Sequence, residues 1–220
     1  MKPKETVLVS VAHPDDEAIG PGGTIAKYAK EGKRVIVILF TDGESSHPWK
    51  KKHFIVKTRK SEIEKSGKLL GVSHIERLSL PDGMLLKEIN NPKHKNKLVS
   101  LLEKYKPTKV FTHAHDDMLF PDHLAVHTVT VQAVDYYTKI HNTHIDVYTF
   151  NIWAINIRKR YRPQLYVDIS QTYELKKQAI HEFKSQNVAL TLLWPTIIAK
   201  AFLAGLHLGV RYAEKFYKIR

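Results

Sequence analysis

The sequence predicts an α/β protein whose mostly parallel sheet is covered by helices on both faces. Short runs that are apolar at nearly every position alternate with segments of helical spacing, which is typical of parallel strands buried on both sides. The 220 residues are 43% hydrophobic and 26% charged, the composition of a folded globular protein. We therefore expect residues 1–220 to form one domain, with an apolar segment at about 187–210.

The first half of the chain alternates between the two patterns. Strands are predicted at the short β-rich runs Thr6–Ala12, Arg34–Thr41 and, more weakly, Ile75–Leu80. Helices are predicted at Thr24–Glu31 and Val56–Leu70, because each of these patterns stops at a glycine.

The second half continues the alternation. Strands are predicted at Lys109–His113, Val147–Trp153 and Gln164–Ile169. Helices are predicted at Asn96–Tyr105, which ends near a proline, at Leu124–Lys139 and at Glu174–Lys184.

Polar side chains that can bind a metal follow the predicted strands. In open α/β sheets the ligand lies beyond the carboxyl ends of the strands. His13–Glu17 follow the first strand, Asp42–Glu44 the second and Asp82 the third, whereas His113–Asp117 and then Asp122–His123 follow the fourth. These side chains are concentrated where the fold rule predicts a site.

The charge balance predicts a positive field. The chain has 35 Lys and Arg against 22 Asp and Glu, a net charge of +13, which attracts phosphates, nucleic acid or anionic lipids. A solvated, lysine-rich surface explains the same charge. No RNA-binding signature is present, so no specific nucleic-acid partner is expected. The chain has no cysteine, which excludes a disulfide framework and a cysteine nucleophile. Met1–Lys4 lead into a strand, which predicts no signal peptide and a cytoplasmic protein, with a peripheral place at the membrane face as the alternative.

The string Ala12–Glu17 (AHPDDE) places one histidine and two consecutive aspartates in a turn between a strand and a helix. His13 and Asp16 can ligate one cation while Asp15 points at a bound water. Imidazole nitrogen and carboxylate oxygen are ligands of Zn²⁺, and a catalytic zinc site keeps a fourth position open. The alternative is that an aspartate only caps the following helix.

The string Phe120–His123 (FPDH) follows the fourth strand and precedes a helix. His123 is the predicted third ligand, which gives two histidines and one aspartate around the metal. It is one of four histidines between positions 113 and 127 and lies opposite the first motif in the predicted sheet. The alternative is a structural histidine beside an apolar helix.

These strings resemble the PIG-L/LmbE family of zinc-dependent N-deacetylases, which carries AHPDDE after its first strand and HPDH after a later one. The resemblance covers residues 6–216 and implies a Rossmann-like three-layer αβα sandwich. Further matching strings lie along the chain: Gly20–Thr24, Thr41–Glu44, Arg59 with Glu62, Leu80–Gly83, Val167–Ile169, Lys176, Ser185–Gln186 and Tyr212–Glu214.

The resemblance implies the metal site and its base. His13, Asp16 and His123 would hold Zn²⁺, although Fe²⁺, Co²⁺ or Mn²⁺ can take the same donors. Asp15 would be the general base. Asp122 would orient a neighbouring histidine or lie just outside the ligands.

The resemblance also implies a substrate site. Arg59 would bind the substrate or the acetate product, with Asp42 and Asp82 beside it. The alternative for Arg59 is a helix-surface arginine paired with Glu62.

The implied reaction removes an acetyl group from an N-acetylated amino sugar or its conjugate, an N-acetylglucosamine-type small molecule. Zn²⁺ would lower the pKa of a bound water toward ~7 and polarise the amide carbonyl. The metal and nearby donors would stabilise the tetrahedral oxyanion. Asp15 would return its proton to the leaving amine.

The chain departs from the family at Phe120, where the family has a histidine that stabilises the oxyanion or protonates the amine. His115 is the predicted substitute, with His113 and His127 as further candidates, and a strand-end histidine bonded to backbone is the alternative. No tyrosine closely follows the Ser-Gln pair, where some members place one. A second hypothesis is therefore a metal-binding, catalytically weak protein that recognises an anionic glycolipid or a nucleotide-sugar.

The segment Val188–Val210 is apolar at most positions. Pro195 and Lys200 make an unbroken membrane span unfavourable. The alternatives are a buried or oligomer-facing helix and an interfacial segment at an anionic membrane surface. Members of the family are often oligomers, so we expect a homo-oligomer.

Overall fold

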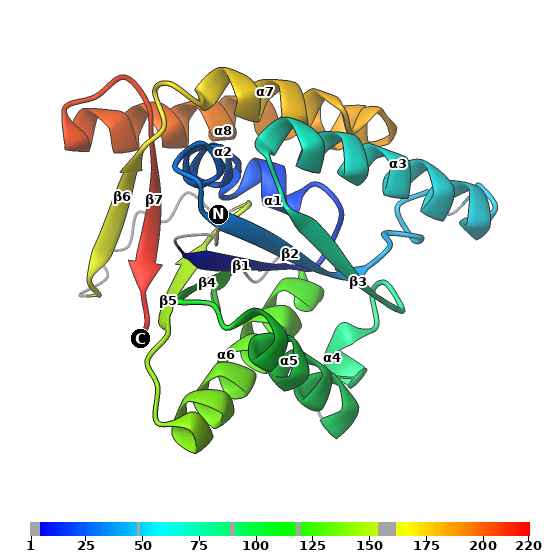
Figure 1. Cartoon of the computed structure of the whole chain (residues 1–220). Coiled ribbons are helices and arrows are strands. Elements are labelled where there is room, and N and C mark those ends of the chain that lie inside the picture. Colours follow the sequence, from blue (N-terminus) through cyan, green and yellow to red (C-terminus); the bar gives the residue numbers. More distant parts are fainter. Residues whose placement is uncertain (1–4, 48, 89–90, 118–119, 154–161) are drawn as a thin grey trace.

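The structure, a computed structural model, describes residues 5–47, 49–88, 91–117, 120–153 and 162–220. In this part of the chain, seven strands form one sheet in the order β3-β2-β1-β4-β5-β7-β6 (Figure 1). The strands are β1 (Thr6–Val11), β2 (Arg34–Thr41), β3 (His74–Leu80), β4 (Lys109–His113), β5 (Asp146–Phe150), β6 (Gln164–Asp168) and β7 (Ala213–Lys218).

The sheet is mostly parallel, as predicted. Strands β1 to β5 pair in parallel, and β1 runs alongside β2 from the pair Thr6–Arg34 to the pair Val11–Leu39. The sequence did not indicate β7, whose segment AEKFYK is half polar. This strand pairs antiparallel with both β5 and β6.

Helices cover both faces, which confirms the three-layer αβα sandwich (Figure 1). One layer holds α1 (Asp16–Ile19), α2 (Gly22–Lys30), α3 (Lys52–Leu70), α7 (Tyr173–His181), the 3-10 turn η1 (Lys184–Gln186) and α8 (Asn187–Leu208). The other layer holds α4 (Leu85–Glu88), α5 (Pro92–Tyr105) and α6 (Pro121–His141). Several helices begin earlier than predicted, and the strand expected at Val147–Trp153 ends at Phe150.

Strand β1 shows why its sequence is apolar at almost every position. Val7 and Val9 belong to the core cluster under α2, α3 and α8, whereas Leu8 belongs to the cluster under α5 and α6. Side chains alternate between the two faces of a strand, so a strand covered on both sides needs apolar residues in both registers.

The apolar segment near the C-terminus folds as the single helix α8, with Pro195 inside it. Leu190, Leu193 and Ile197 are buried in the core, whereas Val188 is 81% and Leu192 74% exposed. By length and composition alone, the segment Lys184–Leu208, which includes α8, could cross a membrane, and 33% of its most apolar window is buried in the fold. The buried-helix alternative is therefore right for one face of α8.

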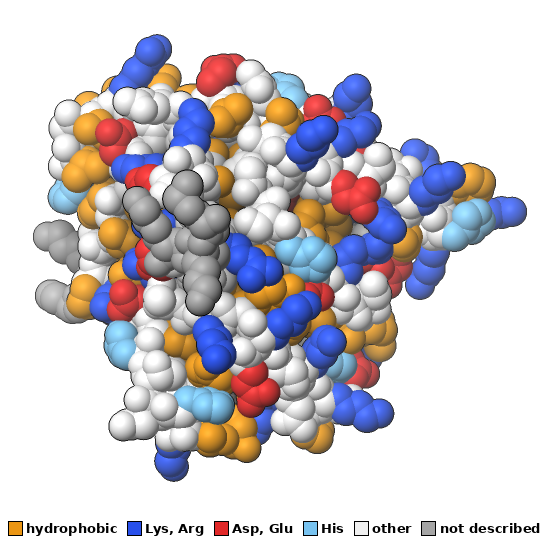
Figure 2. All heavy atoms as spheres, in the orientation of Figure 1, with side chains coloured by type: hydrophobic (Ala, Val, Ile, Leu, Met, Phe, Trp, Pro, Cys, Tyr) orange, Lys and Arg blue, Asp and Glu red, His pale blue; other side chains and the backbone are white. Residues whose placement is uncertain are grey.

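Basic side chains are scattered among acidic, apolar and polar ones on the face shown in Figure 2. On this face the Lys and Arg side chains are spread over the surface rather than gathered in one basic patch. This distribution favours the solvated-surface interpretation of the charge there.

Candidate metal centre

The polar segments that follow β1 and β4 meet at the carboxyl ends of these neighbouring strands. From β1 the chain continues to β2 and β3 on one side of the sheet, and β4 is followed by β5 on the other side. His13–Asp16 follow β1, Asp117 follows β4, and His123 lies in the first turn of α6. The site therefore lies at the topological switch point, where open α/β sheets bind their ligands.

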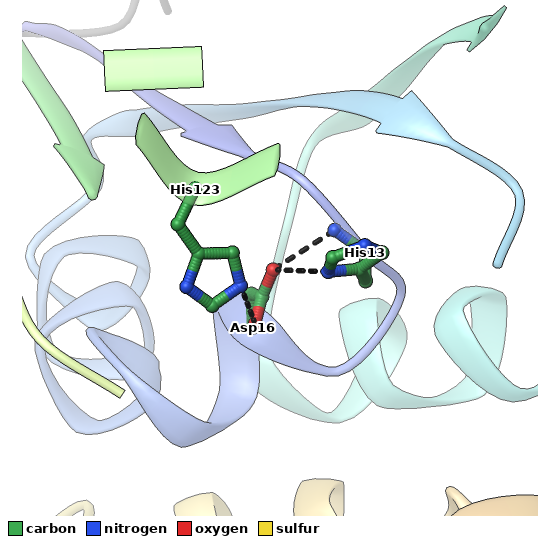
Figure 3. Close-up of side chains that lie close together, drawn as sticks. All are labelled: His13, Asp16 and His123. Atoms are coloured by element: carbon green, nitrogen blue, oxygen red, sulfur yellow. Dashed lines mark hydrogen bonds and ion pairs between the residues drawn. The ribbon is translucent and has the colours of Figure 1, made fainter. Parts of the chain in front are cut away.

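His13, Asp16 and His123 converge, with ligand atoms within 4.8 Å of one another (Figure 3). The Asp16 carboxylate lies between the two imidazoles, with Oδ2 3.6 Å from His13 Nδ1 and Oδ1 3.6 Å from His123 Nε2. The backbone N–H of His13 donates to Asp16 Oδ2 at 2.8 Å, which ties this carboxylate to its own turn. Two imidazoles and one carboxylate at this spacing fit a divalent cation, and these donors suit Zn²⁺ as well as other transition metals.

A buried carboxylate, Asp117, orients His123. Its Oδ2 lies 3.0 Å from His123 Nδ1, which directs the other ring nitrogen toward Asp16. Asp117 in turn accepts hydrogen bonds from the backbone N–H of Ile152 at 2.9 Å and of Trp153 at 3.4 Å. Such a partner behind a metal-binding histidine fixes its ring and tautomer.

His113 is fully buried and forms a wall of the centre. Its ring stacks on His123 with centroids 3.9 Å apart, and its Nε2 accepts a hydrogen bond from the backbone N–H of Ala12 at 3.1 Å. Burial, with His123 nearby, lowers the pKa of His113 to about 4. This imidazole is therefore neutral at physiological pH.

Further carboxylates surround His13. Its Nε2 lies 3.1 Å from Asp82 Oδ1 and 3.5 Å from Asp122 Oδ2. Burial disfavours a protonated His13, but Asp122, Asp16 and Asp82 outweigh burial and hold its pKa well above 6.5. This surplus of negative charge around an imidazole suits a cation.

Asp15 has an unusual backbone, with φ of 122° and ψ of −30°. A non-glycine residue in such a region costs about 1–3 kcal/mol, and such residues cluster at functional sites. Arg59 donates from Nη2 to Asp15 Oδ2 at 3.1 Å and to the Pro14 carbonyl. Burial raises the pKa of Asp15 to about 6, although the charge of Arg59 opposes this shift. Asp15 can therefore exchange a proton close to neutral pH.

Glu17 supports this turn from inside the protein. It is fully buried and accepts hydrogen bonds from the backbone N–H of Asp15 at 3.0 Å and from Ser66 Oγ at 2.8 Å. Burial raises the pKa of Glu17 to about 8. The strained residue Asp15 is thus held at both its backbone and its side chain.

A cavity of about 420 Å³ opens onto these residues. Asp15, Arg59, Asp82 and Asp122 line it together with the three candidate ligands. One aromatic wall is formed by Phe120, whose ring stacks on Trp153 with centroids 5.1 Å apart. Helix α8 adds an apolar wall through Leu190 and Leu193.

Two residues expected in the site lie outside this cavity. Asp42 follows β2 as expected, but Arg77 on β3 binds its carboxylate at 2.6 Å. His115 is exposed, and its ring lies 5.6 Å from that of His127. Because β4 ends at His113, strand alternation does not carry His115 to the side of the metal centre. The structure thus places both Asp42, predicted in the substrate site, and His115, the predicted substitute for the family histidine, outside the cavity that holds the three candidate ligands.

Arg59 lies in the cavity, and the alternative of a surface pair with Glu62 is wrong. Its side chain is only 2% exposed. Glu62 instead accepts hydrogen bonds from the backbone N–H and the hydroxyl of Ser185, at 2.8 and 2.7 Å.

Two residues of the centre, Asp117 and Glu17, were given no role from the sequence, and His113 was only a further candidate for the place of the family histidine. The signal for Asp117 was present, because it lies in the polar run after β4, but that run offers several carboxylates and histidines. Glu17 is the last residue of the AHPDDE string, and the local sequence indicates only that it belongs to the following helix. Only the packing shows that its carboxylate turns back onto Asp15.

Comparison with known sequences identifies a family that matches more than half of the chain and a relative that matches most of it. Residues 8–134 match the PIG-L family, described as GlcNAc-PI de-N-acetylase. The chain is 30% identical over 222 aligned residues to the diacetylchitobiose deacetylase of Thermococcus kodakarensis, and the alignment covers 94% of this chain and 80% of the relative.

Comparison with solved structures shows the same fold. The N,N'-diacetylchitobiose deacetylase of Pyrococcus horikoshii superposes with a TM-score of 0.82 at 27% identity, over 98% of this chain and 84% of that one. GalB of Pseudomonas putida, a 4-carboxy-2-hydroxymuconate hydratase, superposes with a TM-score of 0.81 at 18% identity, over 98% of this chain and 96% of that one. The same fold thus serves proteins with different reactions, so the fold alone does not identify a reaction.

Proposed function

This chain belongs to the PIG-L family, and on that premise we propose that it is a metal-dependent hydrolase that removes an acetyl group from an N-acetylated amino sugar or its conjugate. The observation that carries the proposal is the convergence of His13, Asp16 and His123 beside Asp15 in one cavity. The relatives named for diacetylchitobiose make N-acetylglucosamine-type sugars the substrate class.

His13, Asp16 and His123 would hold the metal ion, and Zn²⁺ is the ion we propose. When bound, the ion supplies a Lewis acid that activates water and polarises the amide carbonyl. Asp117 keeps the ring of His123 in place, and the backbone N–H of His13 keeps the Asp16 carboxylate in place. Metal analysis of the purified protein distinguishes Zn²⁺ from Fe²⁺, Co²⁺ and Mn²⁺.

Asp15 would carry the proton of the reaction. Its carboxylate takes a proton from the attacking water and returns it to the leaving nitrogen, a transfer favoured by a pKa of about 6. Among the described residues that line the cavity, the histidines are His13 and His123. Both are candidate ligands, and Phe120 cannot move a proton. Asp15 would therefore carry both proton transfers.

The cavity walls suit a sugar ring. Arg59 and Asp82 offer charged groups for hydroxyls or for the acetyl carbonyl, whereas the stacked rings of Phe120 and Trp153 offer an apolar face. Ligand sites typically combine apolar walls with a few polar groups that fix orientation. We propose that the C–H face of the pyranose packs on this aromatic wall.

Acetate release from a panel of N-acetylated sugars tests the proposal. The panel holds N-acetylglucosamine, diacetylchitobiose and nucleotide-linked and inositol-phospholipid-linked N-acetylglucosamine, with Asp15→Ala as the blank. Release above this blank supports the deacetylase. Metal binding without release, together with retention of an anionic glycolipid or nucleotide-sugar, would favour the catalytically weak binding protein.

The exposed face of α8 supports a further partner, for which we propose a second copy of the chain or an anionic membrane surface. Val188 and Leu192 are exposed there, and the net charge of +13 favours anionic lipid. Sedimentation velocity tests for the homo-oligomer, and co-sedimentation with anionic against neutral vesicles tests for the membrane surface. The cytoplasmic location of the protein stays a prediction.

A further inference from the structure

The two peptide groups that hold Asp117 are also bonded on their other side. The N–H groups of Ile152 and Trp153 donate to the Asp117 carboxylate. The carbonyls of the same two peptide groups belong to Asn151 and Ile152, and both accept from Lys200 Nζ, at 3.1 and 2.7 Å. The C=O and N–H of a planar trans peptide point in opposite directions, so Lys200 and Asp117 clamp the same short segment from opposite sides.

Lys200 is a half-buried cation. It lies on α8, between the buried residues Ile197 and Ala201. Among the described residues, the hydrogen bonds of its ammonium run to the two carbonyls alone. Burial lowers the pKa of Lys200 to about 8, and the negative charge of Asp117 opposes this shift. The two charges therefore attract each other across the peptide groups that separate them.

We infer that Lys200 is a positioning residue of the metal centre, which acts on His123 through two peptide groups and Asp117. A cation on a peptide carbonyl polarises that amide and makes its N–H a stronger donor. Stronger N–H groups hold the Asp117 carboxylate in place, and this carboxylate holds His123 Nδ1 at 3.0 Å. The inference rests on the proposed role of His123 as a metal ligand.

A purely structural role for Lys200 gives a different expectation. In that case its two hydrogen bonds only anchor α8 to the end of β5, and their loss lowers the stability of the protein with or without metal. In a positioning role, the loss appears in the affinity for the metal. A buried ammonium is costly to desolvate, so an apolar side chain at position 200 need not destabilise the metal-free protein.

The first experiment measures Zn²⁺ affinity of the full chain by competition with a chromophoric chelator. Lys200→Met removes the charge but keeps the length. Outer partners of metal-binding histidines are typically worth about 10–100-fold in affinity, and we expect Lys200→Met to weaken binding by about tenfold without lowering the thermal midpoint of the metal-free protein. Lys200→Arg, which keeps a donor for both carbonyls, restores most of the affinity. The control Lys177→Met, which removes a lysine paired with Glu174 on α7, leaves it unchanged.

The second experiment asks whether Lys200 acts through Asp117. If it does, the double variant of Lys200→Met with Asp117→Asn binds Zn²⁺ no more weakly than Asp117→Asn alone. Both substitutions then remove the same support of His123, so their effects on the affinity do not add. Wild-type affinity in Lys200→Met, or losses that add in the double variant, would overturn the inference. His123→Ala distinguishes a failure of this inference from a failure of the proposed function. Unchanged Zn²⁺ affinity in that variant would refute the proposed ligand set itself.

Discussion

Replacing Arg59 by glutamine tests whether Asp15 is the group that carries the proton. Burial raises the pKa of Asp15 to about 6 even though the guanidinium of Arg59, 3.1 Å away, opposes the shift. An arginine beside an aspartate lowers the pKa of that aspartate by about 1–3 units. Arg59→Gln removes this opposition, so the pKa of Asp15 should rise by a similar amount.

The assay is the pH dependence of kcat/KM for acetate release. A general base works in its deprotonated form, so the rate falls about tenfold per pH unit below the pKa of Asp15. A bound dication lowers the pKa of Asp15 in both proteins, and the difference between them is the measured quantity. We expect the acidic limb of Arg59→Gln to lie about 1–3 units higher than in the wild type.

Two controls accompany this assay. Metal content is measured at each pH, because loss of the ion would imitate an acidic limb. Arg59→Lys keeps a positive charge and should move the limb less. An acidic limb at the same pH in Arg59→Gln and the wild type, with metal retained, would refute the assignment of the limb to Asp15.

Three further outcomes are expected. Asp15→Asn should keep its metal, because this side chain is not a candidate ligand, and should lose about 10²–10⁴-fold in kcat; full activity would remove Asp15 from the mechanism. Trp153→Ala should raise KM for a sugar substrate more than it lowers kcat, as measured by acetate release, since it removes part of the aromatic wall; an unchanged KM would contradict stacking there. Burial lowers the pKa of Lys200 from 10.5 to about 8 in the folded protein. Between pH 8 and 10.5 the unfolded chain therefore binds more protons than the folded one. The free energy of unfolding of the wild type should therefore rise with pH across this window relative to Lys200→Met, by at most about 3 kcal/mol; denaturant titrations at pH 7.5 and 10 check this, and a relative fall would contradict it.

The candidate ligands could be predicted because they lie in short sequence motifs directly beside predicted strands and helices. His13 and Asp16 sit in one turn directly after a buried strand, and His123 begins the helix after another. The rule that ligands lie beyond strand ends brings these two segments together without knowledge of any side-chain contact. The parallel sheet was predictable for the same reason, since β1 and β2 are apolar in both registers.

The supporting residues could not be predicted, because their roles depend on contacts between distant segments. Asp42 looks like a site residue until the pairing of β2 with β3 places Arg77 against it. His115 stands two residues from His113, yet only His113 lies within β4. The bonds of Lys200 join positions 48 and 49 residues apart, which no periodicity of α8 reveals.

Titration of the metal-free protein with Zn²⁺, with acetate release from diacetylchitobiose as the readout, tests the central claim most directly. The proposed ligand set predicts a rate that rises to a plateau at one ion per chain and that is absent from His123→Ala at the same concentrations. A rate that is the same in the metal-free and loaded protein, or that survives in His123→Ala, would contradict catalysis at this centre.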